Sequence, residues 1–462
     1  MLSPYDLTRR KFIGNACAAV GATGVLSALA QLRVIGALAA DATTASSDYK
    51  ALVCIFLYGG NDANNLIIPV DTTGYNLYSS QRTAIALPQS TVTALKPAKY
   101  SDGFTYGMHP GMVELQNLFG AGKMAILANT GTLVRPTTLA NYMSGNPAFL
   151  PPQLFSHSDQ QTQWQSSLSD QPFQTGWGGR LADIINAINT NSSISMSVSV
   201  AGQNSFQVGQ TTSEYSVSTS GAIGLTGATG GTINPVRYQA QLDLLSQTEK
   251  NLFNAAFANT STSAITDSAL LTSVISGATA MQTKFPTTSL GQQMSMIAKL
   301  ISAAPQFGLK RQVFFASIGG FDTHTVQLAS QNSLYPQVSQ AINAFYNATV
   351  ELGVQNQVTS FTASDFSRTY NTNGDGADHG WGSHHMIVGG AVNGGDIYGA
   401  MPSQKLGGPD DTGRGRWIPS TSVDQYAATL ASWFGVSATN LPVVLPNIGR
   451  FAKSNLGFMS GT

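Results

Sequence analysis

Ala51-Leu-Val-Cys-Ile-Phe-Leu-Tyr58 leads directly into Gly59-Gly60-Asn61-Asp62. The apolar run has no polar face, which is typical of a central parallel strand covered by helices on both sides. Similar β-like runs occur at 311–318, 358–363 and 386–392, and helix-like stretches occur near 331–351 and 422–434. This alternation predicts an open α/β sheet.

Acidic residues and histidines gather at or soon after the ends of these runs, and such side chains bind divalent cations such as zinc or manganese. They are Asp62, Asp322, His324, Asp365, Asp378, His379, His384 and His385. Three of the six histidines in the chain fall within the glycine-rich segment 378–385. Because open α/β sheets bind ligands just beyond the carboxyl ends of their strands, we predict one metal site there.

A structural role is the alternative for each of these residues. A single aspartate after a strand often caps a helix or makes a turn. For Asp62 taken alone, that interpretation is favoured over a functional one. His109, in Tyr-Gly-Met-His-Pro-Gly, is interpreted as structural.

The N-terminus resembles an export signal. Residues 8–13 read Thr-Arg9-Arg10-Lys-Phe-Ile, and the apolar stretch that follows closes with Ala-Leu-Ala-Ala40. This pattern predicts a twin-arginine signal peptide over residues 1–40, and a membrane anchor is disfavoured because Arg33 interrupts the apolar run. We therefore expect passage through the twin-arginine translocase and a periplasmic or secreted mature chain of residues 41–462.

Composition excludes several classes of protein. The formal net charge is +0 and only 10% of the residues are charged, so there is no electrostatic footprint for nucleic acid or an anionic membrane. No second apolar segment is long enough to span a bilayer. Cys54 is the one cysteine outside the signal, which rules out a disulfide framework.

The segment from about 189 to 305 differs from its surroundings. Residues 189–235 are rich in Ser, Thr, Gly, Asn and Gln with alternating apolar positions, which predicts short antiparallel strands. Residues 236–304 have the apolar spacing of helices. We interpret the segment as an insertion within a single α/β domain.

Taken in order, four motifs resemble those of a bacterial family of twin-arginine-exported proteins, domain of unknown function 1501. They are Leu-Tyr-Gly-Gly-Asn-Asp62-Ala-Asn-Asn, Gly-Gly-Phe-Asp322-Thr-His324, Ser-Asp365-Phe-Ser-Arg368 and Asp378-His379-Gly-Trp-Gly. The resemblance covers essentially the whole mature chain. The family looks like a remote branch of the alkaline phosphatase and sulfatase superfamily, which implies a doubly wound, mostly parallel sheet flanked by helices.

The superfamily pattern also implies ligand roles, with departures. Asp322 and His324 resemble an Asp-plus-His ligand pair, but with one intervening residue where three are typical. The histidine usually adjacent to the third strand-end carboxylate is Phe366 here, and Asp378-His379 resembles that pair in a loop. His384 or His385 resembles the final histidine ligand. These departures leave the number and identity of the metal ions open, with zinc, manganese and calcium as candidates.

The superfamily further implies a hydroxyl nucleophile at a helix N-terminus, where free N–H groups favour an anion. Ser156, in Phe-Ser156-His-Ser-Asp, matches that position, and ordinary capping by Ser156 or Ser158 is the alternative. Thr130, Thr137 and Thr138 are other candidates. Arg368 and Arg180 are predicted to hold substrate oxygens, and a local salt bridge to Asp365 is the alternative for Arg368.

These observations predict an exported metal-dependent hydrolase of a phosphate or sulfate ester, acting on a small ester or a polysaccharide. The main alternative is a metal-stabilised exported protein that binds polysaccharide or a cell-envelope partner without turnover. A phosphoglycerate-mutase-like transfer is disfavoured by the predicted export.

Overall fold

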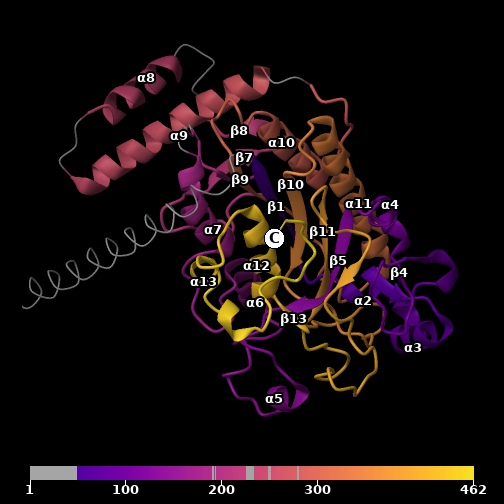
Figure 1. Cartoon of the computed structure of the whole chain (residues 1–462). Coiled ribbons are helices and arrows are strands. Elements are labelled where there is room, and N and C mark those ends of the chain that lie inside the picture. The colour runs from indigo at the N-terminus through magenta and orange to yellow at the C-terminus, as the bar shows by residue number, and fades with distance from the viewer. Residues whose placement is uncertain are drawn as a thin grey trace, which may run out of the picture.

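The computed structural model describes residues 49–189, 192, 194–224, 234–247, 251–277 and 280–461, so the predicted signal peptide lies outside the described residues. At its centre is a 10-stranded sheet with the order β12-β5-β11-β10-β1-β9-β6-β7-β8, and β13 pairs with β5 (Figure 1). The strands are β1 (Lys50–Leu57), β5 (Met124–Gly131), β6 (Ser197–Ser199), β7 (Tyr215–Ser218), β8 (Gly221–Ala222), β9 (Arg311–Ile318), β10 (Val358–Ser364), β11 (Ser383–Gly389), β12 (Ile397–Tyr398) and β13 (Thr421–Ser422).

The sheet is mostly parallel. β1 pairs in parallel with β9 and β10, and β6 pairs in parallel with β9 and β7. β11 runs antiparallel to both β10 and β5. Residues Ala51 to Leu57 of β1 are all buried, as its apolar sequence on both faces requires.

Helices cover both faces of the sheet (Figure 1). One group packs together over β1, β9 and β10 and consists of α6 (His157–Ser166), α7 (Trp177–Ile185), α12 (Val423–Phe434) and α13 (Leu441–Val444). The other group consists of α4 (Val113–Gly120), α10 (Ser289–Ser302) and α11 (Gln327–Glu351). The predicted α/β class, with a mostly parallel sheet flanked by helices, is confirmed.

The prediction of antiparallel strands in residues 189–235 was wrong in part. β6 and β7 extend the main sheet in the parallel direction, and only the short β7–β8 pair is antiparallel. The alternating apolar residues of 194–200 pack into the main core. The alternating pattern therefore predicted that a strand would form, but not which strand it would pair with. The helical prediction for 236–304 matches α8 (Asn234–Leu245), α9 (Leu252–Gly277) and α10, with α9 packed against the edge strand β8 and α8 packed against α9 (Figure 1).

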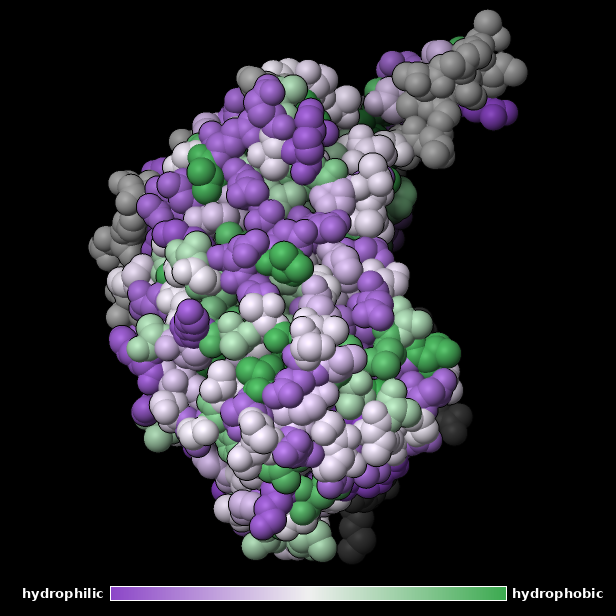
Figure 2. All heavy atoms as spheres, turned by 90° about the vertical axis from the view of Figure 1, so that its right-hand side faces the viewer, coloured by the Kyte–Doolittle hydropathy of each residue, from purple (hydrophilic) through white to green (hydrophobic). Residues whose placement is uncertain are grey.

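A smaller three-stranded sheet lies beside the main one. It has the order β2-β4-β3 and is built from β2 (Ile67–Pro69), β3 (Thr93–Ala94) and β4 (Tyr106–Met108). The helices α2 (Ala63–Leu66) and α3 (Thr72–Arg82) pack against β2, whereas α5 (Leu139–Met143) lies apart from this sheet (Figure 1). On the side of the molecule that carries α3 and α4, apolar side chains of the described residues are scattered among polar ones and form no continuous patch (Figure 2).

Candidate metal centre

Three central strands end level with one another. Leu57 of β1 lies opposite both Ile318 of β9 and Ser364 of β10. Since the three strands are parallel, the segments that follow them leave the same edge of the sheet. This alignment brings the loop after β1, the Asp322 segment and Asp365 together.

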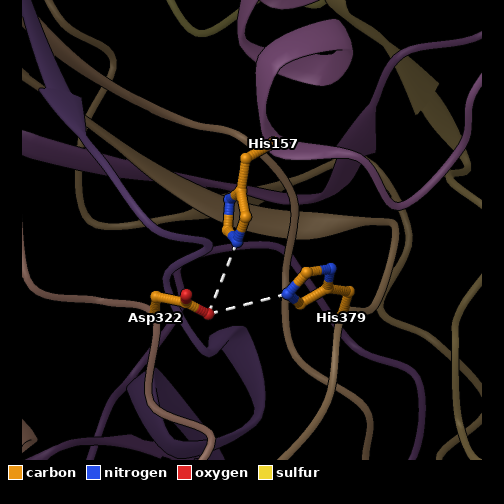
Figure 3. A group of neighbouring side chains, drawn as sticks. All are labelled: His157, Asp322 and His379. Carbon is orange, nitrogen blue, oxygen red and sulfur yellow. Dashed lines mark ion pairs between the residues drawn. The ribbon is translucent and has the colours of Figure 1, made fainter.

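Asp322 is the centre of a group of imidazoles. Its Oδ1 atom lies 3.4 Å from Nε2 of His157, 3.2 Å from Nε2 of His324 and 3.6 Å from Nε2 of His379. Figure 3 shows that His157 comes from the start of α6 while Asp322 and His379 come from loops. The ligand atoms of His157, Asp322 and His379 all lie within 4.8 Å of one another, as a shared metal ion would require.

Two of these imidazoles are oriented by their other ring nitrogen. Nδ1 of His157 lies 2.6 Å from Oδ2 of Asp365, and Nδ1 of His379 lies 2.6 Å from the carbonyl oxygen of Phe155. Each partner is an acceptor, so each Nδ1 carries the hydrogen, and in the neutral imidazole each Nε2 then presents a lone pair. Phe155 has a φ of 71°, a left-handed conformation that is uncommon for a bulky residue and that belongs to the segment aiming its carbonyl at His379.

The donor set fits a divalent cation. Two imidazole nitrogens and a carboxylate oxygen face one another, an arrangement that suits a cation, although the same Asp322 oxygen also accepts from Arg368. Nε2 of His157 is buried and has no hydrogen-bond partner among the described residues. Nitrogen and carboxylate donors in this number suit zinc or manganese better than calcium, which prefers oxygen ligands.

Neighbouring groups shift the pKa values of His157, His379 and Asp322 in different directions. The hydrogen bond to Asp365 raises the pKa of His157, whereas burial lowers the pKa of His379. Burial alone would raise the pKa of Asp322, but the hydrogen bond and positive charge of Arg368 outweigh it, and the pKa lies below its usual value. Asp322 therefore stays ionised. Its side chain is half exposed, with 50% of its surface accessible.

His324 and Asp378 form one side of the site. Nε2 of His324 lies 2.9 Å from Nε2 of His379, and its Nδ1 lies 3.3 Å from Oδ1 of Asp378. Asp378 in turn pairs with Arg414. The structure thus brings four predicted ligands together, Asp322, His324, Asp378 and His379, while their role as ligands stays a prediction.

Asp365 is a buried carboxylate that supports the site through hydrogen bonds. Its side chain has no exposed surface, and its Oδ1 accepts a hydrogen bond from the backbone N–H of Gly59 at 3.2 Å. Its Oδ2 also accepts from Gln161 of α6 at 2.7 Å. Asp365 therefore links β1, β10 and α6 and contacts the group through His157.

Arg368 supports the loops of the site. Its guanidinium is fully buried and donates to the carbonyl oxygens of Gly59, Gly60, Phe321 and Ala377, as well as pairing with Asp322. The substrate-holding role predicted for Arg368 stays a prediction, but its hydrogen-bond donors are used within the protein. The alternative partner predicted for it, Asp365, binds His157 and Gln161 instead. The other predicted arginine, Arg180, donates to carbonyl oxygens of Ser166, Thr175 and Val444.

Asp62 has different partners from Asp322. It caps α2, forms a fully buried ion pair with Arg82 and accepts a hydrogen bond from Gln327 at 2.6 Å. Gln327 in turn accepts from the hydroxyl of Thr323, next to Asp322, at 3.3 Å. Asp62 thus supports the segment that carries Asp322, and it is not in the group of ligand atoms around that residue.

His384 and His385 lie inside β11. Nδ1 of His384 accepts from the backbone N–H of Asn129 at 3.0 Å. His385 packs against the rings of Trp164 and Tyr426, and neither of its ring nitrogens has a hydrogen-bond partner among the described residues. Burial lowers the pKa of both histidines to about 3. Both face the protein interior, and their ligand role stays a prediction.

The candidate hydroxyls differ in their surroundings. Ser156 is the N-cap residue of α6, and its hydroxyl donates to Asp159 at 2.6 Å. Thr130 is buried in β5 and donates to a backbone carbonyl, as does Thr137. Thr138 caps α5. Only Ser156 of these four is flanked by two residues of the site, Phe155 and His157.

Sequence reasoning missed His157 as a candidate ligand. It recognised the Ser-His pair only for its serine. The available signal was the position of the histidine at the first turn of a predicted helix, since this is where side chains point beyond the end of a sheet. His109 is buried and its Nδ1 accepts from the backbone of Gly111, in agreement with its structural interpretation.

An α/β sheet with histidines and aspartates at its strand ends defines the class of this protein. The chain belongs to the family described as Protein of unknown function (DUF1501), whose model matches residues 49–412. The membership predicted from the motifs is therefore confirmed.

Solved structures include distant likenesses. The chain is similar to Ps i-CgsB in complex with k-i-k-neocarrahexaose at 9% identity, with a TM-score of 0.37 over 87% of this chain and 77% of that chain. It is also similar to the PsFucS1 sulfatase from Pseudoalteromonas sp. at 10% identity, with a TM-score of 0.36 over 86% of this chain and 69% of that chain. No curated protein matches the sequence. Across the described ranges, no helix has both the length and the apolar character needed to cross a membrane.

Proposed function

We propose that this protein is a metal-dependent hydrolase of a phosphate or sulfate ester. The observation that carries the proposal is the convergence of Nε2 lone pairs from His157 and His379 on the ionised carboxylate of Asp322. Asp322 is half exposed, so the group is open to a ligand from solvent. The ester class follows from the resemblance to the alkaline phosphatase and sulfatase superfamily.

His157, Asp322 and His379 would hold the cation, with His324 beside them. A cation held there would act as a Lewis acid on an ester oxygen. Asp365 and the carbonyl of Phe155 keep the two imidazoles in the tautomer that exposes Nε2.

Ser156 is the proposed nucleophile. It lies between Phe155 and His157, both of which contact the site, and Asp159 lies 2.6 Å from its hydroxyl oxygen. A carboxylate at that distance is suited to accept the hydroxyl proton as the oxygen attacks. The start of α6 adds backbone N–H groups that favour an anionic substrate.

A non-catalytic, metal-stabilised exported protein is the second candidate. The observation in its favour is that the Ser156 hydroxyl already donates to Asp159 within the first turn of α6, which is a local structural role. In either case the twin-arginine motif supports export with the metal bound, since that route carries folded proteins.

Turnover of aryl phosphates and aryl sulfates separates the two candidates. In the metal-loaded mature chain, Ser156→Ala should lower the rate by several orders of magnitude and leave metal content unchanged. Thr288→Ala is the matched control, because Thr288 is also the N-cap residue of a helix, α10, and its hydroxyl accepts from Gly291 away from the site. A wild-type protein loaded with metal but inert on both esters would favour the non-catalytic candidate. Retained turnover in Ser156→Ala would remove Ser156 from the mechanism.

A further inference from the structure

Arg416 lies against the metal centre with part of its guanidinium unused. Its Nε donates to the carbonyl oxygen of His379 at 2.8 Å, and its Cζ lies 4.9 Å from the centre of the Phe155 ring. Phe155 is the residue whose carbonyl orients His379. Arg416 is thus fixed by the same two residues that set the geometry of the site.

The terminal nitrogens of Arg416 have no recorded partner. Within the described ranges, neither Nη1 nor Nη2 makes a hydrogen bond, and no carboxylate forms an ion pair with the side chain. The two other arginines of the site differ, since Arg368 is saturated by carbonyls and Asp322, and Arg414 pairs with Asp378. Arg416 is therefore the site arginine with donors left for a ligand.

The loop that carries Arg416 is rigid. Asp411 accepts hydrogen bonds from the backbone N–H groups of Gly413 and Gly415, each at 2.7 Å, and residue 411 bridges to Trp417. Gly415 has a φ of 72°, and a Cβ there would lie 2.2 Å from Cβ of Tyr370. The Arg416 guanidinium is accordingly pre-organised, which lowers the entropy lost when it binds a ligand.

We propose that Arg416 binds the anionic group of the substrate through Nη1 and Nη2 and so selects for oxyanion esters at this centre. The proposal rests on the proposed function for the identity of the site. A planar guanidinium matches two oxygens of a tetrahedral sulfate or phosphate group, and stacking on Phe155 holds the plane in place. The hydrogen bond from Nε to the carbonyl oxygen of His379 keeps Nη1 and Nη2 near this candidate ligand.

The test measures binding of inorganic sulfate and inorganic phosphate to the metal-loaded mature chain by titration calorimetry. Arg416→Gln should weaken binding of the preferred anion by about 10- to 100-fold, which is the loss expected for hydrogen bonds to a charged group. Arg416→Lys keeps the charge without the fork and should recover only part of the affinity. The anion that binds more tightly identifies the ester class.

Arg135→Gln is the matched control. Arg135 also lies over a phenyl ring, that of Phe149 at 5.4 Å, but is exposed and contacts no residue of the site. The Arg135→Gln variant should bind both anions with wild-type affinity. All variants should keep the wild-type metal content. Unchanged anion affinity in Arg416→Gln, or a wild type that binds neither anion, would overturn the proposal.

Failure of this inference can be told from failure of the proposed function. A wild type that binds sulfate or phosphate through Arg416 but turns over no ester would keep the inference and remove the hydrolase. An active hydrolase whose KM is unchanged in Arg416→Gln would do the reverse.

Discussion

Asp365 has no exposed surface, and it reaches the metal centre only through His157. A buried carboxylate at Nδ1 fixes the imidazole and strengthens Nε2 as a ligand, and partners of this kind typically change metal affinity by about 10- to 100-fold when they are removed. Asp365 was predicted as a ligand from its place after a strand. Position along the strand did not reveal that α6 would put a histidine between Asp365 and the group.

Asp365→Asn should therefore lower metal affinity by about 10- to 100-fold without abolishing binding. The asparagine keeps the shape but removes the negative charge that pairs with the His157 N–H. Competition with a chromophoric chelator measures the affinity. Asp396→Asn is the control, because Asp396 is also buried but accepts its hydrogen bonds from Lys99, Tyr100 and Ile397. Complete loss of metal from Asp365→Asn would instead make Asp365 a direct ligand.

At the scale of elements, the apolar pattern of the sequence was sufficient to predict the central strands of the sheet. The runs that became β1, β9 and β10 were visible because both faces are buried, and their ends showed where Asp322 and Asp365 would gather. The partners of loop side chains were not visible. Asp62 and Asp322 look alike in sequence and each pairs with an arginine, yet only Asp322 also meets three imidazoles, a difference set by tertiary contacts alone.

Gly59, in the loop after β1, lies directly against the Asp322 segment. Its φ is 113°, and a Cβ there would lie 2.4 Å from the backbone nitrogen of Asp322. Gly59→Ala should force the Asp322 segment away from β1, lowering metal affinity and thermal stability together. Gly103→Ala is matched for backbone strain, with a φ of 94°, but has open space around the Cβ position.

Calorimetry and metal titration of both glycine variants test this point. Gly103→Ala should lose about 1 kcal/mol from backbone strain and keep its metal affinity. If Gly59→Ala behaved in the same way, the close approach of the two loops would have no bearing on the site.

For the whole molecule, buried histidines link stability to pH. Burial lowers the pKa of His109 to about 4 and of His384 and His385 to about 3, from an ordinary value of 6.5. These histidines stay neutral in the folded state while the unfolded chain takes up protons below about pH 6.5. Stability should therefore fall as pH decreases from about 6.5 towards 4, by about 1.4 kcal/mol per pH unit for each histidine.

His385→Leu tests the size of this effect. It should flatten the dependence of unfolding free energy on pH by about 1.4 kcal/mol per pH unit, because one titrating group is removed. Urea denaturation of metal-free protein between about pH 6.5 and 4 gives the slopes. The same variant should keep its metal content if His385 is only a core residue. An unchanged slope would show that His385 is protonated in the folded state.

The central strand β1 lies early in the chain but pairs with strands from its second half, which delays folding of the sheet during synthesis. Its neighbours β9 and β10 are synthesised long after it. The Ser364 hydroxyl donates to the carbonyl oxygen of Leu57, 307 positions earlier in the chain. Contacts at such sequence separation make folding slow, because a long loop must close before they form. A nascent chain thus carries β1 without either of its neighbouring strands until residues 311–364 have been made, and the proposed cation site is incomplete until residue 379 has emerged.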